Sequence, residues 1–138
     1  MNVSLTSCKK EIIELHQFFE DWAKGKIPKN AIDRLHSVLA SAFIIITPEA
    51  QMIRKKQLID MIESGYGKFG TQSDQYKIWI EDVDSRKVSP NTFLSTYKEW
   101  QNINGAEQAR QSTVFFQLEN SQPNGLLWQH VHETWISS

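Results

Sequence analysis

The sequence predicts an α+β fold in which helices from the N-terminal half cover one face of a bent antiparallel sheet. Apolar residues recur at helical spacing in three early segments, and alternating tracts rich in β-branched and aromatic residues fill the second half. The last tract, residues 126–136, has large rings on both faces. A strand of this kind is usually covered on both sides, which favours helices on one face and a partner on the other.

Three amphipathic helices are expected before residue 66. The first helix should begin at a good N-cap residue and end at a glycine, and residues 1–6 before it are expected to fray. The second follows a proline suited to a first helical turn. The residues that mark these helices are Ser7 and Gly25, then Pro28, then Arg54 and Gly65.

His16 lies on or near the apolar stripe of the first helix. Such a histidine either packs in the core or faces a cavity, and its place on the stripe favours packing.

Short and long strand signals alternate with turns. Residues 43–47 predict a buried strand, and residues 52–53 a brief return strand. The longer strands are expected near residues 76–83, 93–101, 112–118 and 126–136.

The dipeptide Asn104-Gly105 is a strong hairpin signal. A two-residue turn there pairs Ile103 with Ala106. The same register places Glu99 opposite Arg110 and Trp100 opposite Ala109, a charge pair and a large–small pair.

Size and charge limit the possible functions. A chain of 138 residues predicts a single domain, residues 1–138, able to bury a core without staples. The net charge of −1 and pI near 6.4 argue against a nucleic-acid partner. The basic run at residues 54–56 is expected to be a solvated helix turn.

The cysteine content and the apolar runs indicate a cytoplasmic protein. The single cysteine, Cys8, excludes an internal disulfide and a thiolate metal cluster. No apolar segment precedes it that would suit a signal peptide, and the longest apolar run, residues 39–46, is too short to span a bilayer. No membrane role and no cofactor are expected.

Several short stretches carry a family resemblance: residues 18–22 with Gly25, residues 43–48, residues 97–101 and residues 125–135. Together with the order of elements, these stretches resemble the nuclear transport factor 2-like superfamily, particularly its small bacterial SnoaL-like members. The last stretch is also similar to the tail of the calcium/calmodulin-dependent kinase association domain. The resemblance implies a cone-shaped barrel with an internal pocket and a homodimer through the outer sheet face. It does not imply one reaction, since members include isomerases, dehydratases, cyclases and assembly modules.

Extending the pairing through the last hairpin divides the sheet into two faces. Leu118 is expected opposite Trp128, and this register sets Thr113 opposite Glu133. By position, two pocket arginines of the kinase association domain resemble Thr113 and Trp135 here, which favours their face as the inner one and implies a ligand that need not be anionic. The predicted pocket residues are Trp22, Lys98, Trp100, Thr113, Phe115, Val131, Glu133 and Trp135.

Glu133 is the main candidate for chemistry. A carboxylate facing an aromatic cavity loses hydration, which raises its pKa toward the range of a general acid or base. Lys98 on the same predicted face could instead form a salt bridge with Glu133, and this structural role is the favoured one.

His130 and His132 point the same way along one strand and could be two metal ligands. A third ligand, such as Glu99, would be required. A packed or interface role is favoured because Phe116 and Tyr97 are expected beside them, and no metal is predicted.

Three functions remain open. The first is binding of a small apolar or aromatic molecule by a homodimer. The second is a cofactor-free lyase or isomerase that uses Glu133 with His132 or Tyr97 for proton transfer. The third is a protein-assembly module, supported by rings on the outer face.

Overall fold

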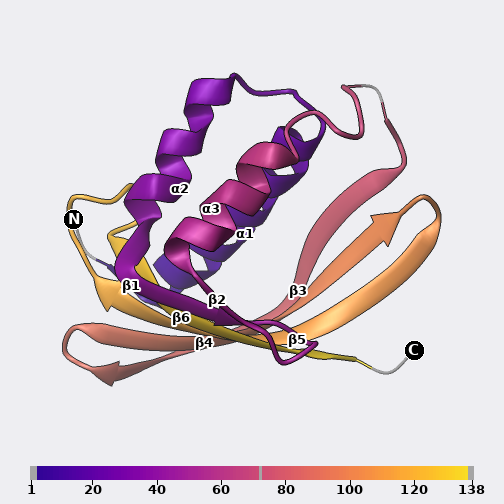
Figure 1. Ribbon diagram of the computed structural model, residues 1–138. Helices are drawn as coiled ribbons and strands as arrows, with labels where there is room; N and C mark the ends of the chain where they lie inside the picture. Colours follow the sequence, from indigo (N-terminus) through magenta and orange to yellow (C-terminus); the bar gives the residue numbers. More distant parts are fainter. Residues whose placement is uncertain (1–2, 72, 137–138) are drawn as a thin grey trace.

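The computed structural model describes residues 3–71 and 73–136 and confirms the α+β prediction. Three helices lie on one face of a six-stranded, strongly curled sheet (Figure 1). The helical segments are α1 (Leu5–Ala23), a short 3-10 turn η1 (Lys29–Ile32), α2 (Asp33–Val38) and α3 (Lys55–Ser64). The strands are β1 (Leu39–Ile46), β2 (Met52–Arg54), β3 (Tyr76–Ser89), β4 (Thr92–Ile103), β5 (Ala106–Leu118) and β6 (Leu126–Trp135).

The sheet is mixed, whereas the sequence predicted an antiparallel one. The strand order is β2-β1-β6-β5-β4-β3, and β1 runs parallel to β6. The remaining neighbours are antiparallel. The connection from β1 to β6 contains α3 and the whole meander, so the final strand returns beside the first strand of the sheet.

Helix α1 begins earlier than predicted. Ser4, with extended backbone, is its N-cap, and the Ser7 side chain accepts a hydrogen bond from the Ser4 backbone N–H at 3.1 Å. The pair forms a capping box, so Ser7 is the third helical residue and the predicted start there was wrong. Residues 1 and 2 of the segment expected to fray lie outside the described residues.

A buried carboxylate, Glu11, anchors helix α1 to α2, to the turn before β6 and to β6 itself. Its side chain is fully buried and accepts hydrogen bonds from Arg34 Nη2 at 3.0 Å, Asn124 Nδ2 at 2.9 Å and Trp128 Nε1 at 2.8 Å. A buried charge needs such partners to offset its desolvation. The cluster therefore connects α1, α2 and the turn before β6.

The β4–β5 hairpin has the predicted register. Asn104 and Gly105 both have positive φ, and Ile103 pairs with Ala106. Glu99 accordingly lies opposite Arg110 and Trp100 opposite Ala109.

The predicted β5–β6 register was wrong by one residue or more. Leu118 pairs with Leu126, and Glu133 lies opposite Ser112 where Thr113 was expected. A bulge at Gln129 shifts the register between Phe115 and Phe116. Because side chains alternate between faces, a one-residue slip moves a whole strand's pattern to the other face.

Among the described residues, no helix has both the length and the apolar character that a bilayer crossing requires.

Candidate ligand pocket

A cavity of about 220 Å³ lies between α1, α3 and the concave face of the sheet. Most of its wall is apolar and partly aromatic. This apolar wall is formed by Leu15, Phe19, Trp22, Leu39, Phe43, Ile45, Leu58, Met61, Ile62, Trp128 and Val131. The cavity lies where helices cover a bent sheet, a usual place for small-molecule sites.

The indole N–H groups of the two tryptophans are already engaged by the protein. Trp22 Nε1 donates to the carbonyl oxygen of Ile62 at 2.7 Å, and Trp128 Nε1 donates to Glu11 at 2.8 Å. Both rings are thereby fixed in orientation. They contribute ring surface to the cavity.

A polar wall faces the rings. It contains a histidine from α1 and side chains from β3 to β6. Its members are His16, Tyr76, Tyr97, Glu99, Gln101, Arg110 and Glu133.

His16 joins α1 to this polar wall. Its Nδ1 lies 2.7 Å from the carbonyl oxygen of Ile12, so Nδ1 carries the proton that is donated there. Its Nε2 lies 3.1 Å from Glu99 Oε1, and both side chains are buried. Burial alone lowers the pKa of His16, but the Glu99 carboxylate more than compensates and raises that pKa.

Glu99 is held as a carboxylate. Burial would raise its pKa, but the His16 charge and hydrogen bond, and then Arg110, lower the pKa well below its usual range. Gln101 Nε2 also donates to Glu99 Oε2. The His16–Glu99 pair is therefore an imidazolium beside a carboxylate.

Glu133 occupies a different electrostatic environment. Burial and the nearby Glu99 charge raise the pKa of Glu133, and Arg110 opposes them. Arg110 Nη1 donates to Glu133 Oε1 at 3.1 Å, and Ser112 Oγ donates to Oε2 at 3.3 Å. Glu133 is thus part of an ion pair, which is the structural role favoured from the sequence, although its partner is Arg110 and not Lys98.

Arg110 links the cavity to the end of β6. Its guanidinium lies 4.8 Å over the Trp135 ring, and Trp135 Nε1 donates to Glu49 at 2.8 Å. The Nε atom of Arg110 is buried and has no hydrogen-bond partner among the described residues. Arg110 therefore retains one unused donor beside the cavity.

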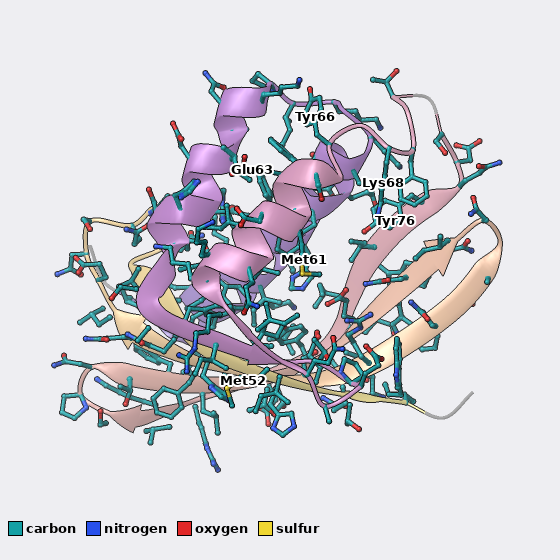
Figure 2. All side chains as sticks on the ribbon, viewed as in Figure 1. Met52, Met61, Glu63, Tyr66, Lys68 and Tyr76 are labelled. Carbon is teal, nitrogen blue, oxygen red and sulfur yellow. The ribbon has the colours of Figure 1, made fainter. Side chains whose placement is uncertain are left out.

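The cavity opens between α3 and β3. Met61 and Lys68 line it and are exposed, and Tyr76, which also lines it, lies beside Lys68 (Figure 2). The Lys68 ammonium lies 5.3 Å over the Phe69 ring. Burial raises the pKa of Tyr76, so its phenol is neutral in the physiological range.

The structure brings only part of the predicted pocket together. Trp22, Val131 and Glu133 line the cavity, and so does Tyr97, whose pKa is raised by burial. Trp135 stacks on Arg110 and is 41% exposed.

The other predicted pocket residues lie on the outer face. Thr113 and Phe115 line a separate outer hollow, together with His132, the candidate for proton transfer, and Trp100 stacks on Trp79. Lys98 pairs with Asp82 at 3.0 Å. Their predicted place in the pocket was wrong because the register slip mismatched the faces of β5 and β6.

Sequence reasoning did not place His16, Glu99 and Arg110 in the pocket. The Asn104-Gly105 hairpin already set Glu99 opposite Arg110, so their pairing was available. Their location on the concave side was not, because the predicted register placed Thr113 opposite Glu133, whereas Ser112 lies there. His16 lines the cavity, and it is also buried against the rings of Phe19 and Tyr97, in keeping with the packing role that was favoured.

Metal binding has no candidate set in the described part of the chain. No three His, Cys, Asp or Glu side chains there are grouped so as to hold an ion.

The curled sheet, the three helices and the position of the cavity give the chain the α+β cone fold seen in nuclear transport factor 2-like and cystatin-like structures. The chain belongs to the sucrose-6-phosphate phosphohydrolase C-terminal family, whose model matches residues 8–137.

The chain is also similar to two plant proteins that are much longer than it. The chain is 26% identical over 129 residues to sucrose-phosphatase 1 of Nicotiana tabacum, covering 91% of this chain and 30% of that protein. It is 24% identical over 148 residues to sucrose-phosphatase 2 of the same plant, covering 98% and 34%. The chain thus spans about a third of these relatives.

Solved structures share the fold at low sequence identity. A nuclear transport factor 2-like protein of unknown function from Pseudomonas aeruginosa has a TM-score of 0.83 and 24% identity, covering 95% of this chain and 99% of that one. The association domain of a C. elegans calmodulin-dependent kinase has a TM-score of 0.61 and 12% identity, covering 94% and 96%.

Proposed function

We propose that residues 1–138 form one small-molecule-binding domain and that the cavity is its binding site. The observation that carries this proposal is the pairing of an aromatic wall with a buried polar wall around one opening. Largely apolar cavities with a few polar groups are typical of ligand sites.

The composition of the polar wall supports a binding role. Two buried carboxylates, Glu99 and Glu133, each need a cation beside them. A buried ion pair is often no more stabilising than apolar packing would be. The presence of two such pairs in the cavity wall therefore favours a role in function over a role in stability.

Binding is tested first by native mass spectrometry of the protein purified under gentle conditions, followed by melting in a panel of metabolites. We expect a co-purifying compound or a rise in melting temperature. Met61→Trp should block the opening and remove either signal, while Met52→Trp, an exposed methionine outside the cavity, should keep it. No bound compound and no response in the panel would contradict the proposal.

A homodimer through the outer sheet face is a second element of the proposal. Trp79 and Trp100 stack there with ring centroids 5.9 Å apart, and the buried Trp100 Nε1 has no partner among the described residues. Rings and an unpaired donor on one face suit a protein interface. Light scattering at low micromolar concentration should report a dimer, and a monomer would contradict it.

Proton-transfer chemistry at Glu133 is an alternative function. The raised pKa of Glu133, caused first by burial, favours it. Tyr97 lines the same cavity, whereas His132 lies on the outer face. Arg110 and Ser112 donate hydrogen bonds to the two carboxylate oxygens of Glu133. Because both oxygens are engaged, we favour ligand binding over proton-transfer chemistry.

Within the family, we propose that this domain binds a ligand and does not itself hydrolyse a phosphate ester. The support is that both cavity carboxylates are occupied by internal partners. We place the domain in the cytoplasm, in keeping with a single, buried Cys8.

A further inference from the structure

We infer that the cavity takes a neutral, hydroxylated ring, the chemistry of an unphosphorylated sugar. This inference rests on the proposed binding function and specifies its ligand class. The competing classes are the apolar or aromatic molecule expected from the sequence and an anionic sugar phosphate.

Charge balance argues for a neutral ligand. The polar wall carries two carboxylates, Glu99 and Glu133, and two cations, His16 and Arg110, each within 3.1 Å of a carboxylate oxygen. Within the polar wall no positive charge is left over to bind a phosphate, and an anion there would approach two buried carboxylates. Lys68 is an exposed cation that also lines the cavity, and its ammonium lies over the Phe69 ring outside the polar wall's ion pairs.

The unused hydrogen-bonding capacity argues for hydroxyl groups. Each ionised carboxylate has about four lone-pair sites, and the described residues give Glu133 and Glu99 one partner at each oxygen. Acceptors are therefore left over at both carboxylates, and Arg110 Nε is an unpaired buried donor. A hydroxyl both donates and accepts, so it can use both kinds of group.

The opposite wall suits the apolar side of a ring. Trp22 and Trp128 have their N–H groups engaged elsewhere, so the ligand meets ring surface. An aromatic face is electron-rich and attracts the weakly positive C–H hydrogens of a sugar ring. A ligand with C–H groups on one side and hydroxyls on the other thus matches both walls.

The cavity volume indicates one ring. A volume of about 220 Å³ is below the range of roughly 300–1,000 Å³ for drug-sized ligands. The opening beside Met61 lets a second ring of a disaccharide extend into solvent. We therefore expect both monosaccharides and sucrose to bind.

Isothermal titration calorimetry of the full chain tests the inference with five probes: glucose, sucrose, glucose 6-phosphate, sucrose 6-phosphate and indole. We expect glucose and sucrose to bind, each phosphate ester to bind at least about tenfold more weakly, and indole not to compete. Tighter binding of a phosphate ester, or binding of indole alone, would overturn the ligand class while leaving a small-molecule pocket in place. The absence of measurable binding for all five probes would also overturn the inferred ligand class. If a different compound nevertheless co-purifies, the proposed binding function survives that result.

Two variants and one control variant locate the sugar. Glu133→Gln keeps the shape and removes the charge, and should weaken sugar binding about tenfold. Glu107→Gln, an exposed glutamate on the same hairpin, should leave it unchanged. Met61→Trp alters an exposed side chain at the opening, so it tests occupancy even if Glu133→Gln fails to fold. Sugar binding that survives Met61→Trp would contradict the inference.

Discussion

His16 and Glu99 form a buried ion pair across the cavity, joining α1 to β4 with 3.1 Å between Nε2 and Oε1. The contact links residues that are 83 positions apart in the chain. The packing of α1 against the sheet therefore depends on the protonation states of His16 and Glu99.

This pair predicts a pH-dependent stability. The pKa of His16 is raised in the fold, so its contribution is fully present below the ordinary histidine pKa of about 6.5 and is lost as pH rises through the raised value. The pKa of Glu99 is lowered, so its contribution is lost only as pH falls below about 4.3 and through the lowered value. The raised pKa of Glu133 also reduces stability as pH rises.

We therefore expect the free energy of unfolding to fall as pH rises above about 6.5, the ordinary histidine pKa. Urea unfolding at several pH values in that range measures it. His16→Gln should flatten the decline, while His36→Gln, at an exposed histidine, should retain it. An unchanged slope in His16→Gln would show that the pair does not act as described.

The Glu11 cluster predicts a large stability loss from a small change. Glu11→Gln removes the charge that pairs with Arg34 and places an amide among the donors of Asn124 and Trp128. We expect a loss of roughly 3 kcal/mol in the free energy of unfolding. Glu14→Gln, at a side chain that is 43% exposed, should cost less than about 1 kcal/mol. Equal effects of the two changes would argue against the cluster as an anchor of α1.

Elements with local signals could be predicted from the sequence. Helix α3 runs from Lys55 to Ser64, close to the expected start at Arg54 and end at Gly65, because its apolar spacing and its glycine are local. The β4–β5 register followed from a two-residue turn.

The concave face could not be predicted in full because it depends on a bulge. Strict alternation puts Trp128 on the face of His130, but the bulge at Gln129 places Trp128 in the cavity wall with Val131 and Glu133. Neither the amino-acid composition of β6 nor its alternation of apolar and polar residues predicts a bulge at Gln129.

The outer face gives a prediction about assembly. Phe115→Lys places a charge on the half-buried outer face and should convert the proposed dimer to a monomer, because an unpaired charge is costly in an interface. Glu63→Lys, exposed on α3, serves as the control and should remain dimeric. Sedimentation velocity distinguishes the two states. A Phe115→Lys protein that remains dimeric would place the interface elsewhere.

The cavity is tested most directly by the indole N–H signals of the five tryptophans in ¹H–¹⁵N correlation spectra during a titration with sucrose. Single Trp→Phe variants assign the signals. The signals of Trp22 and Trp128, in the cavity wall, should shift in a saturable way, while those of Trp79 and Trp100, on the outer face, should remain in place. Shifts confined to Trp79 and Trp100, or no shift with sucrose or with any compound that raises the melting temperature, would contradict a ligand site inside the cone.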